Sequence, residues 1–123
     1  MTPIESIELL FAPIAAAVEQ FAANHAFKLA KCERGNNGWE LSQPHREGGE
    51  QTLLLLYDPA LGLGVGAVWS VPCAETRMLY SHFCGMNACP IEPETVVAAL
   101  EAVVGQLAAV RYGHWTHMQP FTP

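Results

Sequence analysis

Residues 52–71 read TLLLLYDPALGLGVGAVWSV, and this stretch decides the fold that the sequence predicts. Residues 52–57 are apolar on both faces, as in a central β-strand, and Asp58-Pro59 is typical of a turn. From Leu63 to Val71, bulky side chains alternate with glycine and smaller residues, which predicts a strand with one bulky and one bare face. The short link between the two strands favours an antiparallel pair over a parallel crossover.

The same stretch contains GLGVGA at 62–67, which fits the loose G-x-G-x-x-[G/A] pattern of dinucleotide-binding turns. In that motif the glycine turn opens a helix whose N-terminus faces the pyrophosphate. Here residues 68–72 are β-branched, aromatic and then interrupted by proline, so no helix is predicted. We therefore expect no nucleotide or other cofactor. We interpret Gly64 and Gly66 as positions where another group approaches the strand closely.

Further strands are predicted on both sides of this stretch. Residues 27–34 and 39–43 flank Gly35-Asn36-Asn37-Gly38, a pattern typical of a tight hairpin. Residues 77–84 form the last predicted strand, and residues 44–51 (PHREGGEQ) are predicted to be a polar surface loop. Short links throughout favour an antiparallel meander.

A helix is predicted at each end of the chain. Thr2-Pro3-Ile4-Glu5 is typical of a capping box, Pro13 predicts a kink, and the first helix should stop near Asn24-His25. The second helix should begin around Pro93 and end at Gly113. Apolar residues recur at steps of three and four in both segments, at Ile4, Ile7, Phe11, Ile14, Val18 and Phe21 and at Val96, Leu100, Val103, Leu107 and Val110.

These elements predict a single α+β domain over residues 1–123. Its order is α-β-β-β-β-β-α, an antiparallel meander of about five strands with both helices packed on one face. Half of the residues are hydrophobic and 15% are charged, which is a globular composition. The strands contain too few alternating polar residues for the other face of the sheet to be fully exposed to solvent. We therefore expect that face to present an apolar interaction surface.

The charge of the chain excludes some classes of partner. The formal net charge is −6 and the six Lys and Arg residues form no patch, so no nucleic acid is expected. The first basic residue is Lys28, and no run of 18 uninterrupted apolar residues occurs, so neither a secretory signal nor a membrane span is expected. The four cysteines are interpreted as reduced thiols of a cytoplasmic protein.

The candidate metal ligands in the sequence are His82, Cys84, Cys89, His114 and His117. Cys84 and Cys89 are separated by four residues, and His114 and His117 follow much later, which is poor spacing for structural zinc. We therefore expect no metal. Paired carboxylates occur only where helices begin, and we assign no catalytic residue.

Two candidate sites follow from the aromatic and polar residues of the strands. Trp39, Trp69 and Tyr80 are the expected anchors for a protein partner, with the alternative that all three belong to the core. Tyr80, His82 and Cys84 share one face of the last predicted strand and would line a pocket between helices and sheet. That pocket would belong to a small-molecule-binding or catalytic domain.

The order of elements, the acidity and the segment Pro93–Val110 (PETVVAALEAVVGQLAAV) resemble small acidic secretion chaperones of the type III class and, more broadly, bacterial immunity-type α+β proteins. Those chaperones usually carry a dimerising helix within the strand series. The link Pro59–Gly62 is too short for one, so no family residue is carried over. The resemblance implies a protein that is not an enzyme and binds another polypeptide. We expect a cytoplasmic, homodimeric protein-binding module, with the pocket-bearing domain as the alternative.

Overall fold

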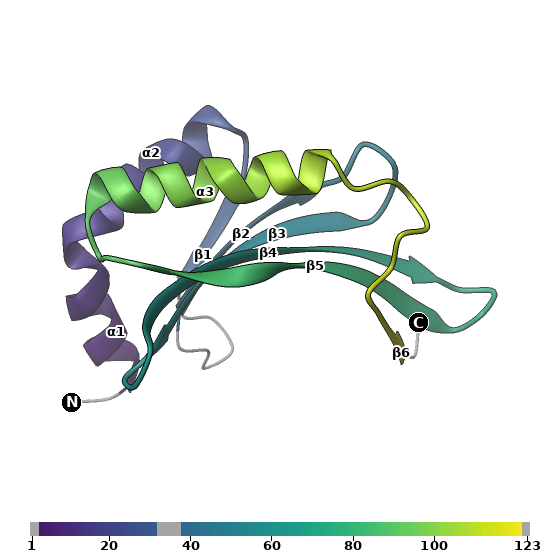
Figure 1. Cartoon of the computed structure of the whole chain (residues 1–123), viewed down its shortest axis with the longest axis horizontal. Coiled ribbons are helices and arrows are strands. Elements are labelled where there is room, and N and C mark those ends of the chain that lie inside the picture. The colour runs from purple at the N-terminus through teal and green to yellow at the C-terminus, as the bar shows by residue number, and fades with distance from the viewer. Residues whose placement is uncertain (1–2, 32–37, 122–123) are drawn as a thin grey trace.

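The chain runs from a helical N-terminus through five strands to a long helix and a short final strand (Figure 1). This structure is a computed structural model that describes residues 3–31 and 38–121. The helical elements are α1 (Pro3–Phe11), the 3-10 turn η1 (Ala12–Ile14), α2 (Ala15–Asn24) and α3 (Pro93–Ala108). The strands are β1 (Lys28–Lys31), β2 (Gly38–Pro44), β3 (Glu50–Asp58), β4 (Gly62–Cys73), β5 (Met78–Cys89) and β6 (His117–Pro120).

All described strands belong to one antiparallel sheet of six strands, in the order β1-β2-β3-β4-β5-β6. Each strand therefore pairs with its neighbour in sequence, and the predicted meander is confirmed. The helices lie on one face of this sheet, and no layer formed by the described residues covers the opposite face (Figure 1). We call the uncovered side the open face. The predicted α+β architecture with both helical segments on one face is thus confirmed.

The N-terminal helix is interrupted where proline predicted a kink. Pro13 lies inside η1, which separates α1 from α2. Because proline has no N–H and its ring clashes with the preceding turn, the α-helical hydrogen bonding cannot run through it. The helix ends at Asn24, as predicted, whereas Thr2 of the predicted capping box lies outside the described residues. The predicted apolar stripe is buried at Ile7, Phe11, Ile14, Val18 and Phe21.

The stretch Ile7–Asn24 has a mean hydropathy of 1.2 and is long enough to cross a membrane. That criterion uses length and composition only, and the core helix of a soluble protein satisfies it as well. One third of the stretch (33%) is buried inside this structure. The stretch by itself therefore assigns no membrane role to the protein.

The hydrophobic core lies between the helices and the sheet. From α3 it takes the predicted stripe of Val96, Leu100, Val103 and Leu107. From β2, β3 and β4 it takes alternate residues, including Trp39, Leu41, Leu53, Leu55, Val65 and Trp69. Each fully buried aliphatic side chain contributes about 1.5–3 kcal/mol relative to exposure, so this layer is the main stabilising element of the fold.

The last predicted strand is longer than expected. It was predicted to end at Cys84, but β5 continues to Cys89. Ala67 of β4 faces Cys84 and Val65 faces Asn87, so one residue of β4 opposes two of β5 in a β-bulge. The bulge shifts the alternation of faces, and the sequence pattern therefore stops resembling a strand at that point.

The C-terminal region also differs from the prediction. The helix ends at Ala108, not at Gly113, and the amides of Ala109 and Val110 bond to carbonyl groups three residues earlier. This tighter turn sends the chain back over the sheet, where β6 pairs with β5. The β6 strand was not predicted, because its four residues are all exposed and show no apolar alternation. Of the first predicted hairpin, residues 32–37 lie outside the described residues.

Candidate functional site

The predicted partner anchors Trp39 and Trp69 lie in the core. Their exposed fractions are 1% and 0%, and both side chains point from the sheet towards the helices. The Trp39 ring meets Phe11 edge-on at 5.0 Å between centroids. Neither indole is on the surface of the described chain, so the alternative interpretation of these residues as core is the one that the structure supports. The sequence contained a signal for the burial of Trp69, because this residue belongs to the bulky face of residues 63–71.

Tyr80, His82 and Cys84 lie on the helix-facing side of β5, as their spacing predicted. Cys84 is buried, and this burial raises the pKa of its thiol. The Tyr80 hydroxyl donates to Thr76 Oγ1 at 3.2 Å, and His82 Nδ1 donates to the carbonyl oxygen of His114 at 2.6 Å.

The space in front of Tyr80 and His82 is occupied by the chain itself. The Trp115 ring lies 6.1 Å from that of Tyr80, and the His114 carbonyl accepts the His82 hydrogen bond. The segment that follows α3 thus covers the position where the sequence predicted a pocket between helices and sheet.

The candidate metal-ligating histidines and cysteines are dispersed over the fold. His82 faces the helix side, whereas His117 pairs with Ser81 and places its ring against Phe83, at 4.6 Å between centroids. Among residues 3–31 and 38–121, no three His, Cys, Asp or Glu side chains converge to hold a metal ion.

A cluster of rings surrounds Trp69 at the end of the sheet beyond α3. The His45 imidazole stacks on the indole at 3.8 Å between centroids, while Tyr112 and Trp115 meet the indole edge-on. Trp69 Nε1 donates to the carbonyl oxygen of Gly48 at 2.8 Å. The cluster therefore ties the 45–49 turn and the C-terminal segment to the core. His45 and Tyr112 were not predicted as members, since they come from loops that only the tertiary fold brings together.

The His45 ring is held in its neutral form. Desolvation against the indole lowers the pKa of His45 from its ordinary 6.5, and nearby Arg46 lowers it further while Glu47 opposes the shift. The backbone N–H of Glu47 donates to His45 Nδ1 at 3.0 Å, which requires a lone pair on that nitrogen. Protonation of Nδ1 would remove this hydrogen bond.

The lowered pKa of His45 predicts a pH dependence of stability. Below pH 6.5 the unfolded chain binds this proton more tightly than the folded chain, so the free energy of unfolding decreases as the pH falls through that value. We expect His45→Phe, which keeps a stacked ring and removes the titration, to flatten this decrease. Urea titrations of both proteins across the acidic range measure the difference. An equally steep loss in the variant would contradict the assignment to His45.

The open face of the sheet carries the remaining candidate surface, and the strand register defines it. Cross-strand pairs place Phe83, Val68, Thr52, Ser42 and Lys28 in one row. The neighbouring rows contain Gly66, Leu54, Glu40 and Ala30, and then Ala88, Gly64, Leu56 and Gly38. In the first row the side chains change from apolar on β5 and β4 to polar or charged on β3, β2 and β1, and in the second row Leu54 on β3 is followed by Glu40 on β2.

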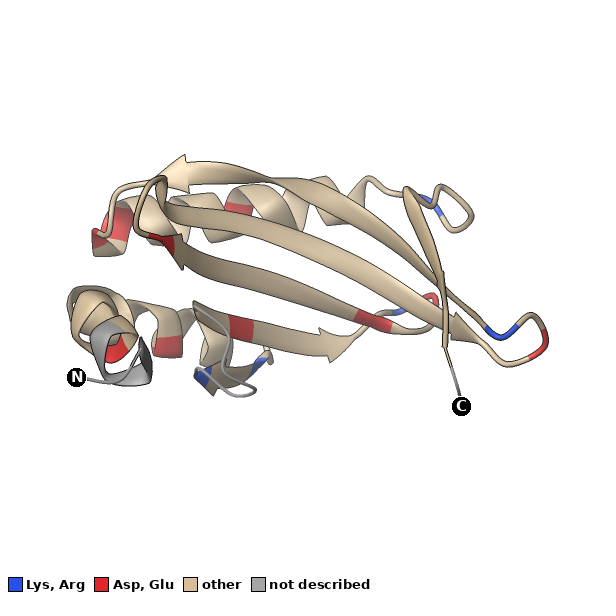
Figure 2. Cartoon of the chain, turned by 90° about the horizontal axis from the view of Figure 1, so that it is seen from below, with Lys and Arg blue, Asp and Glu red and all other residues tan. Residues whose placement is uncertain are grey.

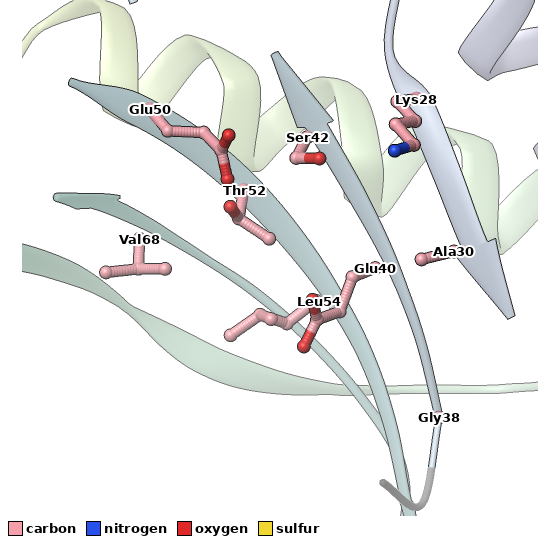
Figure 3. A pocket seen from close by; sticks show the side chains of 9 residues that line it. All are labelled: Lys28, Ala30, Gly38, Glu40, Ser42, Glu50, Thr52, Leu54 and Val68. Carbon is pink, nitrogen blue, oxygen red and sulfur yellow. The ribbon is translucent and has the colours of Figure 1, made fainter. Parts of the chain in front are cut away.

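The polar half of the open face is hollowed. A depression of about 350 Å³ lies over β1 to β4 and is lined by Lys28, Glu40, Ser42, Glu50 and Thr52 together with Leu54 and Val68 (Figure 3). Figure 2 looks onto this face and shows acidic positions among its strands. Two carboxylates face one ammonium group here, so the polar half is net acidic.

The apolar half forms a second hollow of about 620 Å³, which we call the apolar trough. It is lined by Leu56, Leu61, Gly62, Gly64, Met86 and Ala88, together with residues of the β3–β4 turn. Leu61 is 82% exposed, and Met86 and Phe83 are each 45% exposed. Residues 59–74 and 78–91 contain no Lys, Arg, Asp or Glu. Asp58 is the one charged residue in the lining, and its carboxylate accepts hydrogen bonds from the amides of Ala60 and Leu61 in the β3–β4 turn.

The glycines of GLGVGA lie inside β4, and the Met86 side chain packs over them on the open face. A Cβ on Gly66 would lie 2.2 Å from Met86 Sδ and 3.2 Å from the Cys84 carbonyl oxygen. On Gly64 it would lie 3.2 Å from Met86 Cε. The predicted close approach at both glycines is confirmed, and the approaching residue, Met86, lies in the β-bulge.

Gly66→Val is expected to lower the free energy of unfolding by about 1–3 kcal/mol, because the new side chain overpacks the site against Met86. Met86 is flexible and half-exposed, so Met86→Ala in the same protein should restore most of this loss. Urea titration of both single variants and the double variant measures the coupling. A phosphate-cradling loop would give the opposite result, a stable Gly66→Val protein that loses NAD binding shown by the wild type.

Comparison of this chain with protein-family models, with curated proteins and with solved structures gave no match.

Proposed function

We propose that this protein is a non-enzymatic binding module whose open sheet face holds a basic, amphipathic segment of another polypeptide. The observation that carries the proposal is the change in side-chain chemistry across that face. The trough on β3 to β5 is mainly apolar, and the depression on β1 to β4 is acidic. An apolar surface of this kind, rimmed by polar residues, is typical of a protein interaction site.

The chemistry of the partner follows from the two halves. Leucine-like side chains fit the apolar trough beside Leu56 and Met86 and would remove exposed apolar surface from water. Lysine or arginine side chains reaching the other half would meet Glu40 and Glu50, and the net charge of −6 would steer a cationic segment towards the protein. A secretion-chaperone-like or an immunity-like role would both use such a polypeptide partner.

The proposed compartment is the cytoplasm. Cys73, Cys84 and Cys89 are free thiols, which supports a reducing environment.

Binding of two synthetic peptides tests the proposal. One is an amphipathic peptide of leucine and lysine, and the other replaces every lysine with glutamate. We expect fluorescence anisotropy to show binding of the lysine peptide alone. Phe83→Asp should weaken this binding by about tenfold or more, although it makes the protein more acidic, because it removes an apolar contact. If charge attraction alone caused binding, the added aspartate would strengthen the binding of the lysine peptide.

Leu9→Asp is the matched control. Leu9 is an exposed apolar residue (63%) on α1, away from the open face, so an aspartate there adds the same charge without touching the proposed site. We expect this variant to bind the lysine peptide as the wild type does. Equal weakening by Leu9→Asp and Phe83→Asp, or binding of both peptides alike, would rule out the open face as the site.

A photo-crosslinking residue at Val68, compared with one at the exposed Ala102 of α3, extends the test to the natural partner in cells. A discrete polypeptide adduct is expected from Val68 and not from Ala102. Adducts at both positions, or at Ala102 alone, would contradict the proposal.

A further inference from the structure

The outer edge of β5 is only partly covered. The β6 strand pairs with Met78–Ser81, and the next amide on that edge, from Phe83, donates to Thr116 Oγ1 at 3.0 Å. Beyond it, Gly85, Met86, Asn87 and Ala88 are exposed, and no strand among the described residues pairs with them on that side. We call residues 85–89 the free edge.

The free edge lacks the charges that protect the opposite edge of the sheet. The edge strand β1 carries Lys28 and Lys31, and charged side chains, especially lysine, discourage pairing with another strand. Residues 78–91, in contrast, contain no Lys, Arg, Asp or Glu. The unpaired backbone groups of the free edge are thus available for strand addition.

We propose that two copies of this chain pair through the free edge, antiparallel about a twofold axis near Asn87, so that their two sheets become one. Across a twofold axis each side chain faces its own counterpart or a near neighbour, and like charges placed there are repelled. A chain of net charge −6 meets such repulsion over much of its surface, whereas this uncharged segment avoids it. A second copy is therefore the partner that fits.

The apolar trough adds to this interface. Met86 and Ala88 line both the free edge and the trough, so pairing would bring the two troughs next to each other across the twofold axis. The paired strands supply main-chain hydrogen bonds, and the exposed Met86 side chains supply apolar contact. Because this interface and the proposed peptide site share Met86 and Ala88, dimerisation is measured in the absence of peptide.

Opposite charges at Ala88 test the twofold pairing. Ala88 is exposed and pairs with Gly64 of β4, which has no side chain, so the sheet accommodates a longer side chain at position 88. Light scattering should give twice 13.4 kDa for the wild type. Ala88→Glu and Ala88→Lys, each alone, should weaken dimerisation by about tenfold or more through like-charge repulsion. An equimolar mixture of the two variants should recover a dimer, which a merely misfolded variant would not do.

Ala102→Glu on the exposed face of α3 is the matched control and should leave the dimer unchanged. Hydrogen exchange at residues 85–89 should slow as protein concentration rises. A monomeric wild type at the highest soluble concentration would overturn the proposal. So would a dimer that persists in Ala88→Glu and Ala88→Lys alike. Because Phe83→Asp and the peptides report on the open face, failure here and failure of the proposed function are distinguishable.

Discussion

Replacing Trp69 with alanine is expected to lower the free energy of unfolding by about 3–5 kcal/mol. The indole is fully buried, stacks on His45 and donates its Nε1 proton to Gly48. Its removal leaves a cavity in the core and unpairs the Gly48 carbonyl, and it also loosens the C-terminal segment that packs on it. Urea unfolding followed by circular dichroism measures the loss, which is a large share of the roughly 5–15 kcal/mol that a domain has in total.

Phe83→Ala is the control for this substitution. Phe83 is an aromatic residue of the same sheet that is 45% exposed on the open face, so its truncation should cost about 1 kcal/mol or less. If Trp69→Ala were as stable as Phe83→Ala and instead lost peptide binding, Trp69 would be a partner anchor and its assignment to the core would be wrong.

Gly49→Ala should cost about 2–6 kcal/mol, because two separate penalties add. Gly49 has φ +71°, a left-handed conformation in which an L side chain is strained by about 1–3 kcal/mol. A Cβ there would also lie 2.1 Å from the backbone carbonyl oxygen of Ser70, and overpacking of this kind costs about 1–3 kcal/mol. Backbone cannot rotate away as a flexible side chain can, so the turn that carries His45 must move.

Gly62→Ala separates the two penalties. Gly62 also has a positive φ, +84°, but a Cβ on it would meet no atom within 4 Å. Its substitution should therefore cost the conformational strain alone. Thermal or urea unfolding measures the loss of stability in each variant. The loss in Gly49→Ala minus the loss in Gly62→Ala is the cost of the contact with Ser70. Equal losses for Gly49→Ala and Gly62→Ala would show that the contact with Ser70 is unimportant.

The elements that were predicted correctly are those whose signals are local. The period of two in residues 63–71 and the proline at position 13 act through neighbouring residues, so they predicted β4 and the break between α1 and α2. The β-bulge and β6 were missed for the opposite reason. Each depends on pairing with a distant strand, and neither Gly85-Met86 nor residues 117–120 carry a pattern of their own.

The uncovered sheet face was predicted, but the residues exposed on it were not. An apolar sheet face without helices follows from the composition of the strands and from helices packing on one side. The particular residues depend on which face those helices cover, because the side chains of a strand alternate between faces. Trp39 and Trp69 are turned inwards, and the exposed apolar residues are instead Leu61, Phe83 and Met86.

The sequence by itself determined the helices, the order of the strands and their antiparallel meander, because helix period, turn residues and short links act within a few residues of the chain. The tertiary structure alone decided three other things: which side of the sheet stays open, that Met86 covers Gly64 and Gly66, and that the C-terminal segment closes over Tyr80 and His82. These follow from packing between segments distant in sequence, where burial of one face leaves the other to solvent.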